Sequence, residues 1–246
     1  MSHKDAIRIV LVGTQHPGNI GSAARAMKTM GLSNLILVAP LKFPDPEAFS
    51  LAASADDLLY SAQVVETLPE ALQGCRLVIG TSARSRSVAL PEFNPEQAAQ
   101  QLVEKSQNGS VALLFGRERT GLENDELQLC HSSVFIPCNP DYSSLNLAAA
   151  VQVLCYEIRL QHLLVESGAS LLNHKPDTLP ADFEQLEHFF THLGDFMNEV
   201  DFHKGKAPDV VIQRLRRLFL RAEMDEREIK ILRGLLSDAQ RVLRLK

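Results

Sequence analysis

The chain has 246 residues, of which 45% are hydrophobic and 22% are charged, and its formal net charge is −5. This composition is typical of a globular protein with a sizeable core, and the length allows one large domain or a domain with a small appendage. No run of about 18 uncharged apolar residues is present, so we expect no membrane span. The start of the chain lacks the cleavage region of a signal peptide, and we therefore expect a cytoplasmic protein.

The cysteines and histidines do not form a metal-binding pattern. Cys75, Cys130, Cys138 and Cys155 lack C-x-x-C spacing and have apolar neighbours, and the histidines lack H-E-x-x-H spacing. We expect free, buried thiols in a reducing cytoplasm and no metal ion.

Strand and helix patterns alternate through the first two thirds of the chain. Short β-branched runs and apolar residues at helical spacing predict strands at 7–13, 34–40, 77–82, 110–116 and 133–138, and helices at 19–31, 45–59, 94–107 and from Leu145 onward. This alternation predicts an α/β fold with a parallel sheet whose two faces are covered by helices.

The pattern changes beyond residue 165. Residues 166–181 contain Gly, Ser, Asn and Pro with little periodicity, which predicts a linker between a domain at 1–165 and a second domain at 182–246. Only helical periodicity follows, so we expect the second domain to be small and all-α. Residues 204–246 hold 12 Lys and Arg against 6 Asp and Glu, whereas the rest of the chain holds 13 against 24. A basic tail on an acidic body indicates a polyanionic partner.

Ligands of parallel α/β sheets bind outside the carboxyl ends of the strands, so the residues after each strand are candidates for a site. The dinucleotide pattern G-x-G-x-x-G and the phosphate-loop pattern G-x-x-x-x-G-K-[ST] are both absent. Their absence argues against a dehydrogenase and a nucleotide hydrolase. Three polar loops follow apolar strands instead.

The first loop, TQHPGNIGSAARAMKTMG, leads into a helix. Asn19 is a good N-cap, and Gly31 lies where a glycine commonly ends a helix. The apolar stripe of this helix consists of Ile20, Ala23, Ala24 and Met27. Arg25 falls on the opposite, polar side with Ser22 and Lys28, where it is either a functional residue or a solvated surface charge.

The second and third loops have equally simple alternatives. In ALLFGRERTGL, glycines such as Gly116 flank a charged turn, which permits close backbone approach to a ligand or forms an ordinary surface turn. The third, IPCNPDYSSLNLAAAVQVL, carries Ser143, Ser144 and Asn146 at the start of a helix. There Asp141 or a serine would serve simply as the helix cap.

The segments NIGSAARAM, LLFGRERTGL and IPCNPDYSSLNLAAAVQV, in this order and spacing, resemble the three sequence motifs of the SPOUT methyltransferases, TrmH-like branch. The resemblance covers roughly residues 5–162. The segment IGTSARSR and the tail segments QRLRRLFLRA and ILRGLL make the whole chain similar to bacterial tRNA (cytidine/uridine-2′-O-)-methyltransferases, which modify nucleotide 32 of the anticodon loop.

The resemblance implies S-adenosylmethionine as cofactor, transfer of its methyl group to a ribose 2′-hydroxyl of tRNA, no metal ion, and a homodimer with active sites near the subunit interface. It also implies a SPOUT-type sheet with a deep trefoil knot at the third motif, which sequence periodicity does not reveal. By the same resemblance, the cofactor pocket is lined by Thr81, Ser82, Ala83, Gly116, Ile136, Ser143, Ser144, Leu145 and Asn146.

The resemblance assigns Arg25 to the target hydroxyl. Because an arginine side chain stays protonated, orienting the hydroxyl and stabilising the developing oxyanion stand beside the role of general base. The supporting candidates are Asn19, Glu118, Ser144 and Asn146. Glu118 has an alternative role, which is to hold Arg25 in place. Arg25 serves either its own subunit or the partner, and Met27 and Met30 would offer apolar surface for the dimer.

Candidate RNA contacts are Arg84, Arg86, Arg214, Arg217, Arg221 and Arg233. On the helix that carries Arg214, Arg217 and Arg221, we expect Leu215, Leu218 and Phe219 to pack inward. Three alternatives stay open: a non-catalytic RNA-binding module, a SPOUT 2′-O-methyltransferase of another RNA such as ribosomal RNA, and methylation of a base nitrogen as in the TrmD branch.

Overall fold

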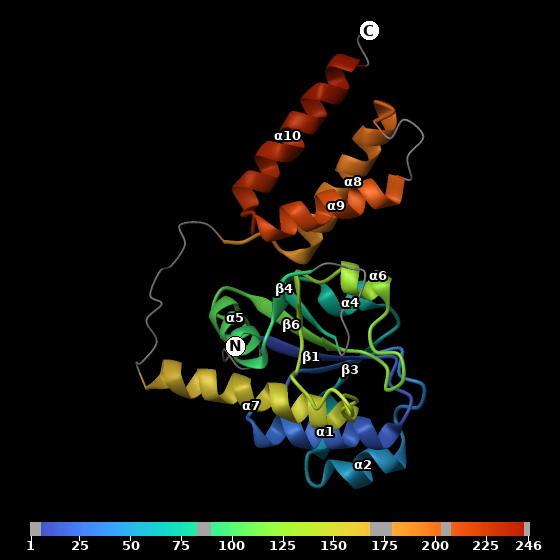
Figure 1. The fold of residues 1–246 in the computed structure, drawn as a ribbon, viewed down its shortest axis with the longest axis vertical. Helices are drawn as coiled ribbons and strands as arrows, with labels where there is room; N and C mark the ends of the chain where they lie inside the picture. The colour runs from blue at the N-terminus through green and yellow to red at the C-terminus, as the bar shows by residue number, and fades with distance from the viewer. Residues whose placement is uncertain (1–5, 83–89, 168–178, 203–207, 244–246) are drawn as a thin grey trace. The chain divides into compact units, whose positions relative to one another are not determined.

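The computed structural model describes residues 6–82, 90–167, 179–202 and 208–243. Contacts between residues divide the chain into two compact units, Met1–Asn173 and His174–Lys246. Figure 1 shows strands and helices in the first unit and helices in the second.

A seven-stranded sheet forms the centre of the first unit. Its strands lie in the order β3-β2-β1-β6-β4-β7-β5, and every neighbouring pair is parallel. The strands are β1 (Ile7–Val12), β2 (Leu35–Val38), β3 (Gln63–Val65), β4 (Cys75–Thr81), β5 (Glu92–Phe93), β6 (Ser110–Phe115) and β7 (Ser132–Val134). The predicted α/β fold with a parallel sheet is confirmed.

Seven helices accompany the sheet within the described part of the first unit. They are α1 (Pro17–Thr29), α2 (Pro46–Ala52), α3 (Asp56–Ser61), α4 (Leu68–Leu72), α5 (Pro95–Ser106), α6 (Asn124–Gln128) and α7 (Leu147–Glu166). The prediction of a single helix at 45–59 is wrong, because Ala53 and Ser54 have positive φ angles and separate α2 from α3. The short elements β3, β5, α4 and α6 were not predicted, and β7 ends before the expected strand does.

The predicted apolar stripe of α1 is confirmed. Its four members are 0% exposed and join one core cluster with β1, α5 and α7. Met27 therefore lies in the core, and the expectation that it would offer apolar surface for the dimer is wrong. On the outer side of α1, a Cβ on Gly21 would lie 1.9 Å from the Ala48 carbonyl oxygen, so glycine lets α1 pack against α2.

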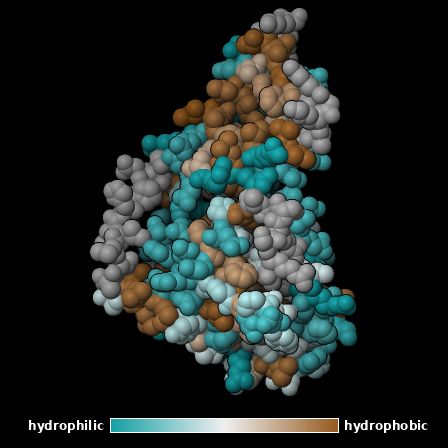
Figure 2. Space-filling view, in the orientation of Figure 1, coloured by the Kyte–Doolittle hydropathy of each residue, from teal (hydrophilic) through white to brown (hydrophobic). Residues whose placement is uncertain are grey.

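The second unit is described through three helices, α8 (Phe183–Glu199), α9 (Pro208–Arg221) and α10 (Glu226–Leu243). Asp182 and Gln185 form a capping box at the start of α8, and Phe189, Phe190 and Leu236 contribute to a separate apolar cluster. Figure 2 shows apolar side chains at the surface of these helices. Leu218 is 51% exposed, so the expectation that it packs inward is wrong.

Two further expectations concern thiols and membranes. Cys75, Cys130 and Cys155 are buried and form no disulfide, as predicted, and burial raises the pKa of the Cys155 thiol to about 12. Cys138 is free but only half-buried, because it lies beyond the end of β7. None of the helices in the described ranges has the length and apolarity needed to cross a membrane.

Candidate active site

The ends of three neighbouring strands meet at one edge of the sheet. Gly80 of β4 is opposite Leu114 of β6, and Thr81 of β4 is opposite Val134 of β7. The Ser82 amide continues this register by donating a hydrogen bond of 3.0 Å to the Val134 carbonyl. The residues that directly follow β4, β6 and β7 therefore lie close together. They lie at the carboxyl ends of the strands, where parallel α/β sheets bind their ligands.

Gly116 follows β6 and is buried where the second loop turns back on itself. Arg117 and Gly121 exchange backbone hydrogen bonds of 3.2 and 2.8 Å across this turn. A Cβ on Gly116 would lie 2.1 Å from the backbone of both Gly121 and Leu122. We had expected this glycine to make room for a ligand, and in the structure it makes room for its own loop.

Glu118 reaches from this loop to the start of α1. Its carboxylate accepts hydrogen bonds from the backbone N–H groups of Gln15 and His16, both at 3.1 Å, and from Asn19 Nδ2 at 2.9 Å. Partial burial opposes ionisation, but the hydrogen bonds from Asn19, Gln15 and His16 outweigh it. The pKa of Glu118 therefore lies below its ordinary value.

The prediction that Asn19 is the N-cap of the first helix is wrong. α1 begins at Pro17, and its N-cap residue, His16, provides no side-chain cap. The sequence did contain a signal, because proline is favoured in the first turn of a helix, where its missing N–H costs nothing. Glu118 supplies from a distant loop the acceptor that the helix start lacks.

Asn19 and Asn146 continue the network from Glu118 to the third loop. Asn146 Nδ2 donates to Asn19 Oδ1 at 2.9 Å, and Asn146 Oδ1 accepts from the Ala148 N–H at 2.9 Å. A carboxylate can only accept and a backbone N–H can only donate, so the two ends of this chain fix the orientation of both amides. Three loops that are far apart in sequence are thus joined by the Glu118–Asn19–Asn146 chain.

Asn146 is also the N-cap of α7. Neither Asp141 nor a serine has this role, and the helix begins at Leu147, two residues later than expected. Ser143 and Ser144 consequently stay exposed just before the helix.

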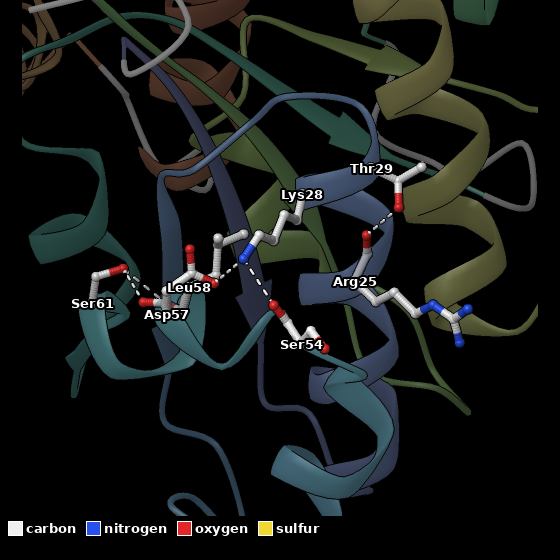
Figure 3. Close-up of polar contacts among 7 residues, drawn as sticks. All are labelled: Arg25, Lys28, Thr29, Ser54, Asp57, Leu58 and Ser61. Atoms are coloured by element: carbon white, nitrogen blue, oxygen red, sulfur yellow. Dashed lines mark hydrogen bonds and ion pairs between the residues drawn. The ribbon is translucent and has the colours of Figure 1, made fainter.

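Arg25 is exposed on α1, and its side chain points away from the polar contacts of its neighbours (Figure 3). Lys28, one turn later, donates to the Ser54 carbonyl at 2.8 Å and forms an ion pair with Asp57 at 2.7 Å. No carboxylate within the described ranges pairs with the Arg25 guanidinium. The expectation that Glu118 holds Arg25 is wrong, because that carboxylate is used at the start of α1.

Arg117 is a residue whose contacts sequence reasoning missed. Its guanidinium lies 3.0 Å from Glu126 Oε1 and 3.7 Å from Glu123 Oε1, at the start of α6. Its Nε would lie 2.8 Å from a Cβ on Gly13, at the end of β1. Arg117, directly beside Glu118, thereby contacts the start of α6 and lies against the residue that follows β1. Only its charge was visible in the sequence, and a turn charge is usually solvated.

The other predicted cofactor residues differ in their exposure. Thr81, Ser82 and Ile136 are half-buried, whereas Leu145 is exposed. Ala83, Arg84 and Arg86 lie outside the described residues. No cluster of three or more His, Cys, Asp or Glu side chains that could hold a metal ion occurs in the ranges that the structure describes.

The arginines of the second unit do not form one uniform group. Arg214, Arg221 and Arg233 are exposed, whereas Arg217 is half-buried, with its Nε 3.4 Å from the Gln213 carbonyl. The neighbouring Arg216 is used internally. It pairs with Glu187, and its guanidinium lies 4.6 Å above the centroid of the Phe190 ring.

Comparison with known protein families identifies the class to which this parallel sheet and its three joined loops belong. Residues 6–156 match the model of the SpoU rRNA Methylase family, and the chain belongs to this family. Residues 184–246 match a second model, the C-terminal domain of the tRNA methyltransferase TrmJ.

Individual relatives resemble nearly the whole chain. The tRNA (cytidine/uridine-2′-O-)-methyltransferase TrmJ of Salmonella typhimurium is 50% identical over 95% of this chain and 96% of its own length. The crystal structure of TrmJ from Z. mobilis has a TM-score of 0.81 at 37% identity and covers 95% of this chain and 98% of that one. A probable methylase family protein from Haemophilus influenzae has a TM-score of 0.65 at 42% identity, with 98% and 99% covered.

Proposed function

We propose that this protein is an S-adenosylmethionine-dependent tRNA ribose 2′-O-methyltransferase that acts on cytidine or uridine at position 32 of the anticodon loop. The structural observation that carries the proposal is the Glu118–Asn19–Asn146 chain, because it joins all three motif loops at the carboxyl edge of the sheet. Membership of the SpoU methylase family and the 50% identical TrmJ relatives support methyl transfer to tRNA.

The residues at the sheet edge fit the proposed cofactor. Half-buried Ile136 and exposed Leu145 offer apolar surface for an adenine ring. Thr81, Ser82 and the serines before α7 offer hydrogen-bonding groups beside it. When bound, the cofactor supplies a methyl group made electrophilic by a positively charged sulfur. The proposed pocket consists of Thr81, Ser82, Ala83, Gly116, Ile136, Ser143, Ser144, Leu145 and Asn146.

Arg25 is the proposed catalytic residue. The bound cofactor would supply the methyl group to the 2′-oxygen and leave as S-adenosylhomocysteine, and the hydroxyl proton would pass to solvent because a protonated guanidinium cannot accept it. An exposed guanidinium that pairs with no carboxylate of the described ranges suits the task of orienting the hydroxyl and its adjacent phosphate and of stabilising the developing oxyanion. Glu118 and Asn19 then act by positioning α1, and Ser144 and Asn146 act by positioning the third loop.

The trefoil knot and the division of labour between domains belong to the same proposal. β6 lies between β1 and β4, and β7 lies between β4 and β5, although each follows its neighbours in the chain. Such inserted strands support a knotted path at the third motif. The family matches at 6–156 and 184–246 support a methyltransferase domain at 1–165, a linker at 166–181 and a basic helical RNA-binding domain at 182–246.

We also propose a homodimer in the cytoplasm. Its motivation is the resemblance of the motifs, and α7 offers partly exposed apolar side chains for such an interface, namely Tyr156, Leu163 and Leu164. In this arrangement Arg25 serves the cofactor of one of the two subunits.

Methyl transfer from labelled S-adenosylmethionine to total tRNA and, separately, to ribosomal RNA tests the function. We expect label in tRNA with a chelator present, at the 2′-oxygen of nucleotide 32. Label in ribosomal RNA alone would indicate that ribosomal RNA is the target. Label on a base nitrogen would indicate base methylation as in the TrmD branch. RNA binding without methyl transfer would indicate a non-catalytic RNA-binding module.

A further inference from the structure

Tyr142 has the most exposed large hydrophobic side chain in the described part of the chain. It is 81% exposed, and it is one of three tyrosines in a chain that has no tryptophan. It stands in the third loop, immediately before Ser143 and Ser144.

The backbone around Tyr142 is held in place. The Tyr142 N–H donates to the Asn139 carbonyl at 2.9 Å, and the Asp141 N–H donates to Asn139 Oδ1 at 3.1 Å. Pro140 fixes one backbone angle between them. The loop is therefore an ordered turn that holds Tyr142 at its end, and binding a ligand to the ring requires little additional ordering of the backbone.

Tyr142 is also close to the network that joins the three loops. Asn146 lies four positions later in the chain, so the two Cα atoms are at most about 14 Å apart. The Asp141 carboxylate beside it would repel a phosphate group. A flat, uncharged surface is the contact that this turn offers.

We propose that Tyr142 is a specificity-determining residue that stacks on a nucleobase of the target loop, either the base of the methylated nucleotide or one of its two neighbours. This inference rests on the proposed function. Proteins commonly recognise single-stranded RNA loops by stacking unpaired bases on aromatic side chains, and such contacts hold a nucleotide in one orientation. A loop held in this way places the target ribose at the site beside Tyr142.

The test compares methylation by the full chain and three variants, with tRNA as substrate. We expect Tyr142→Ala to lower kcat/KM about 5- to 150-fold, the range typical of one stacked base, while cofactor affinity and Tm stay unchanged. Tyr142→Phe should retain activity within about twofold, because phenylalanine keeps the aromatic face. Tyr60→Ala is the matched control: this tyrosine is 79% exposed but precedes the amino end of β3, at the opposite edge of the sheet.

A set of altered tRNAs identifies the base. Each carries one abasic nucleotide, at position 32, at 31 or at 33. At the position whose base stacks on Tyr142, removing the base should erase the difference between the wild type and Tyr142→Ala. Equal kcat/KM for the wild type and Tyr142→Ala on intact tRNA would overturn the stacking role alone. Absence of transfer by the wild type would overturn the proposed function itself.

Discussion

Asn146 Nδ2 donates a hydrogen bond of 2.9 Å to Asn19 Oδ1, which lies 127 residues earlier in the chain. Since Asn19 is also bonded to Glu118, this contact fixes the third loop relative to the first and second. The position of the proposed cofactor loop thus depends on two side-chain amides.

Asn146→Asp removes only one function of this side chain. Aspartate is as good an N-cap as asparagine, so the bond to the Ala148 N–H should persist. It cannot donate to Asn19, however, and we expect kcat/KM for methylation to fall at least about tenfold. Asn94→Asp, at the N-cap of α5, is the matched control and should leave activity unchanged. If Asn146→Asp and Asn94→Asp are both as active as the wild type, the Asn19–Asn146 hydrogen bond is not needed for catalysis.

Glu118 should contribute stability that depends on pH. Its pKa is lower in the folded protein than in the unfolded chain, so this contribution is fully present above the unfolded pKa and is lost as the pH falls through the folded pKa. We expect Glu118→Gln to lower the free energy of unfolding by about 1–2 kcal/mol near neutral pH. In urea unfolding, this difference should shrink below about pH 4. A difference that is independent of pH would contradict the assigned hydrogen bonds.

Arg25→Ala should lower the rate of methyl transfer at least about 100-fold, the usual cost of losing one donor to a developing oxyanion. Cofactor affinity, measured by calorimetry, should change little. Lys28→Ala is the matched control, since Lys28 is an exposed cation one turn along the same helix and already pairs with Asp57. If both variants transfer methyl groups at the wild-type rate, Arg25 is only a surface charge.

Gly13 and Arg117 should show coupled effects on stability. Gly13 has φ +60, and a Cβ there would lie 2.8 Å from Arg117 Nε. We expect Gly13→Ala to destabilise the protein by about 1–3 kcal/mol through backbone strain and displacement of Arg117. In Gly13→Ala/Arg117→Ala the displacement cost disappears, so the double variant should be more stable than additivity predicts. Strict additivity in chemical denaturation would indicate that the two sites are independent.

Arg214 and Arg216 should separate RNA binding from folding. Arg214 is exposed, and Arg214→Ala should reduce the log–log slope of tRNA affinity against salt by about 0.7–0.9, the value for one lost phosphate contact. Arg216 is used by Glu187 and Phe190, so Arg216→Ala should lower Tm and leave that slope unchanged. Filter binding across a salt series measures both. An unchanged slope for Arg214→Ala would show that this arginine is merely solvated.

Periodicity predicted the long elements but not their ends or the links between loops. The stripe of α1 was predictable because four buried side chains recur at helical spacing, and the strands around β1 were predictable because they are apolar on both faces. The role of Glu118 was not predictable, because a carboxylate that caps a helix more than 100 positions earlier leaves no local pattern in the sequence. Leu218 was misjudged because helical spacing identifies an apolar face but does not show what covers it.

The position of β6 has a consequence for how the protein folds. This strand pairs with β1 and β4 on its two sides but is synthesised after both, at residues 110–115. Until it emerges from the ribosome, two apolar strands have unpaired edges, which are prone to pair with other chains. The middle of the sheet is therefore completed late and through contacts between distant segments, which makes folding slow. A nascent chain of this kind is prone to aggregate until about residue 134 has been made, when β7 can also join.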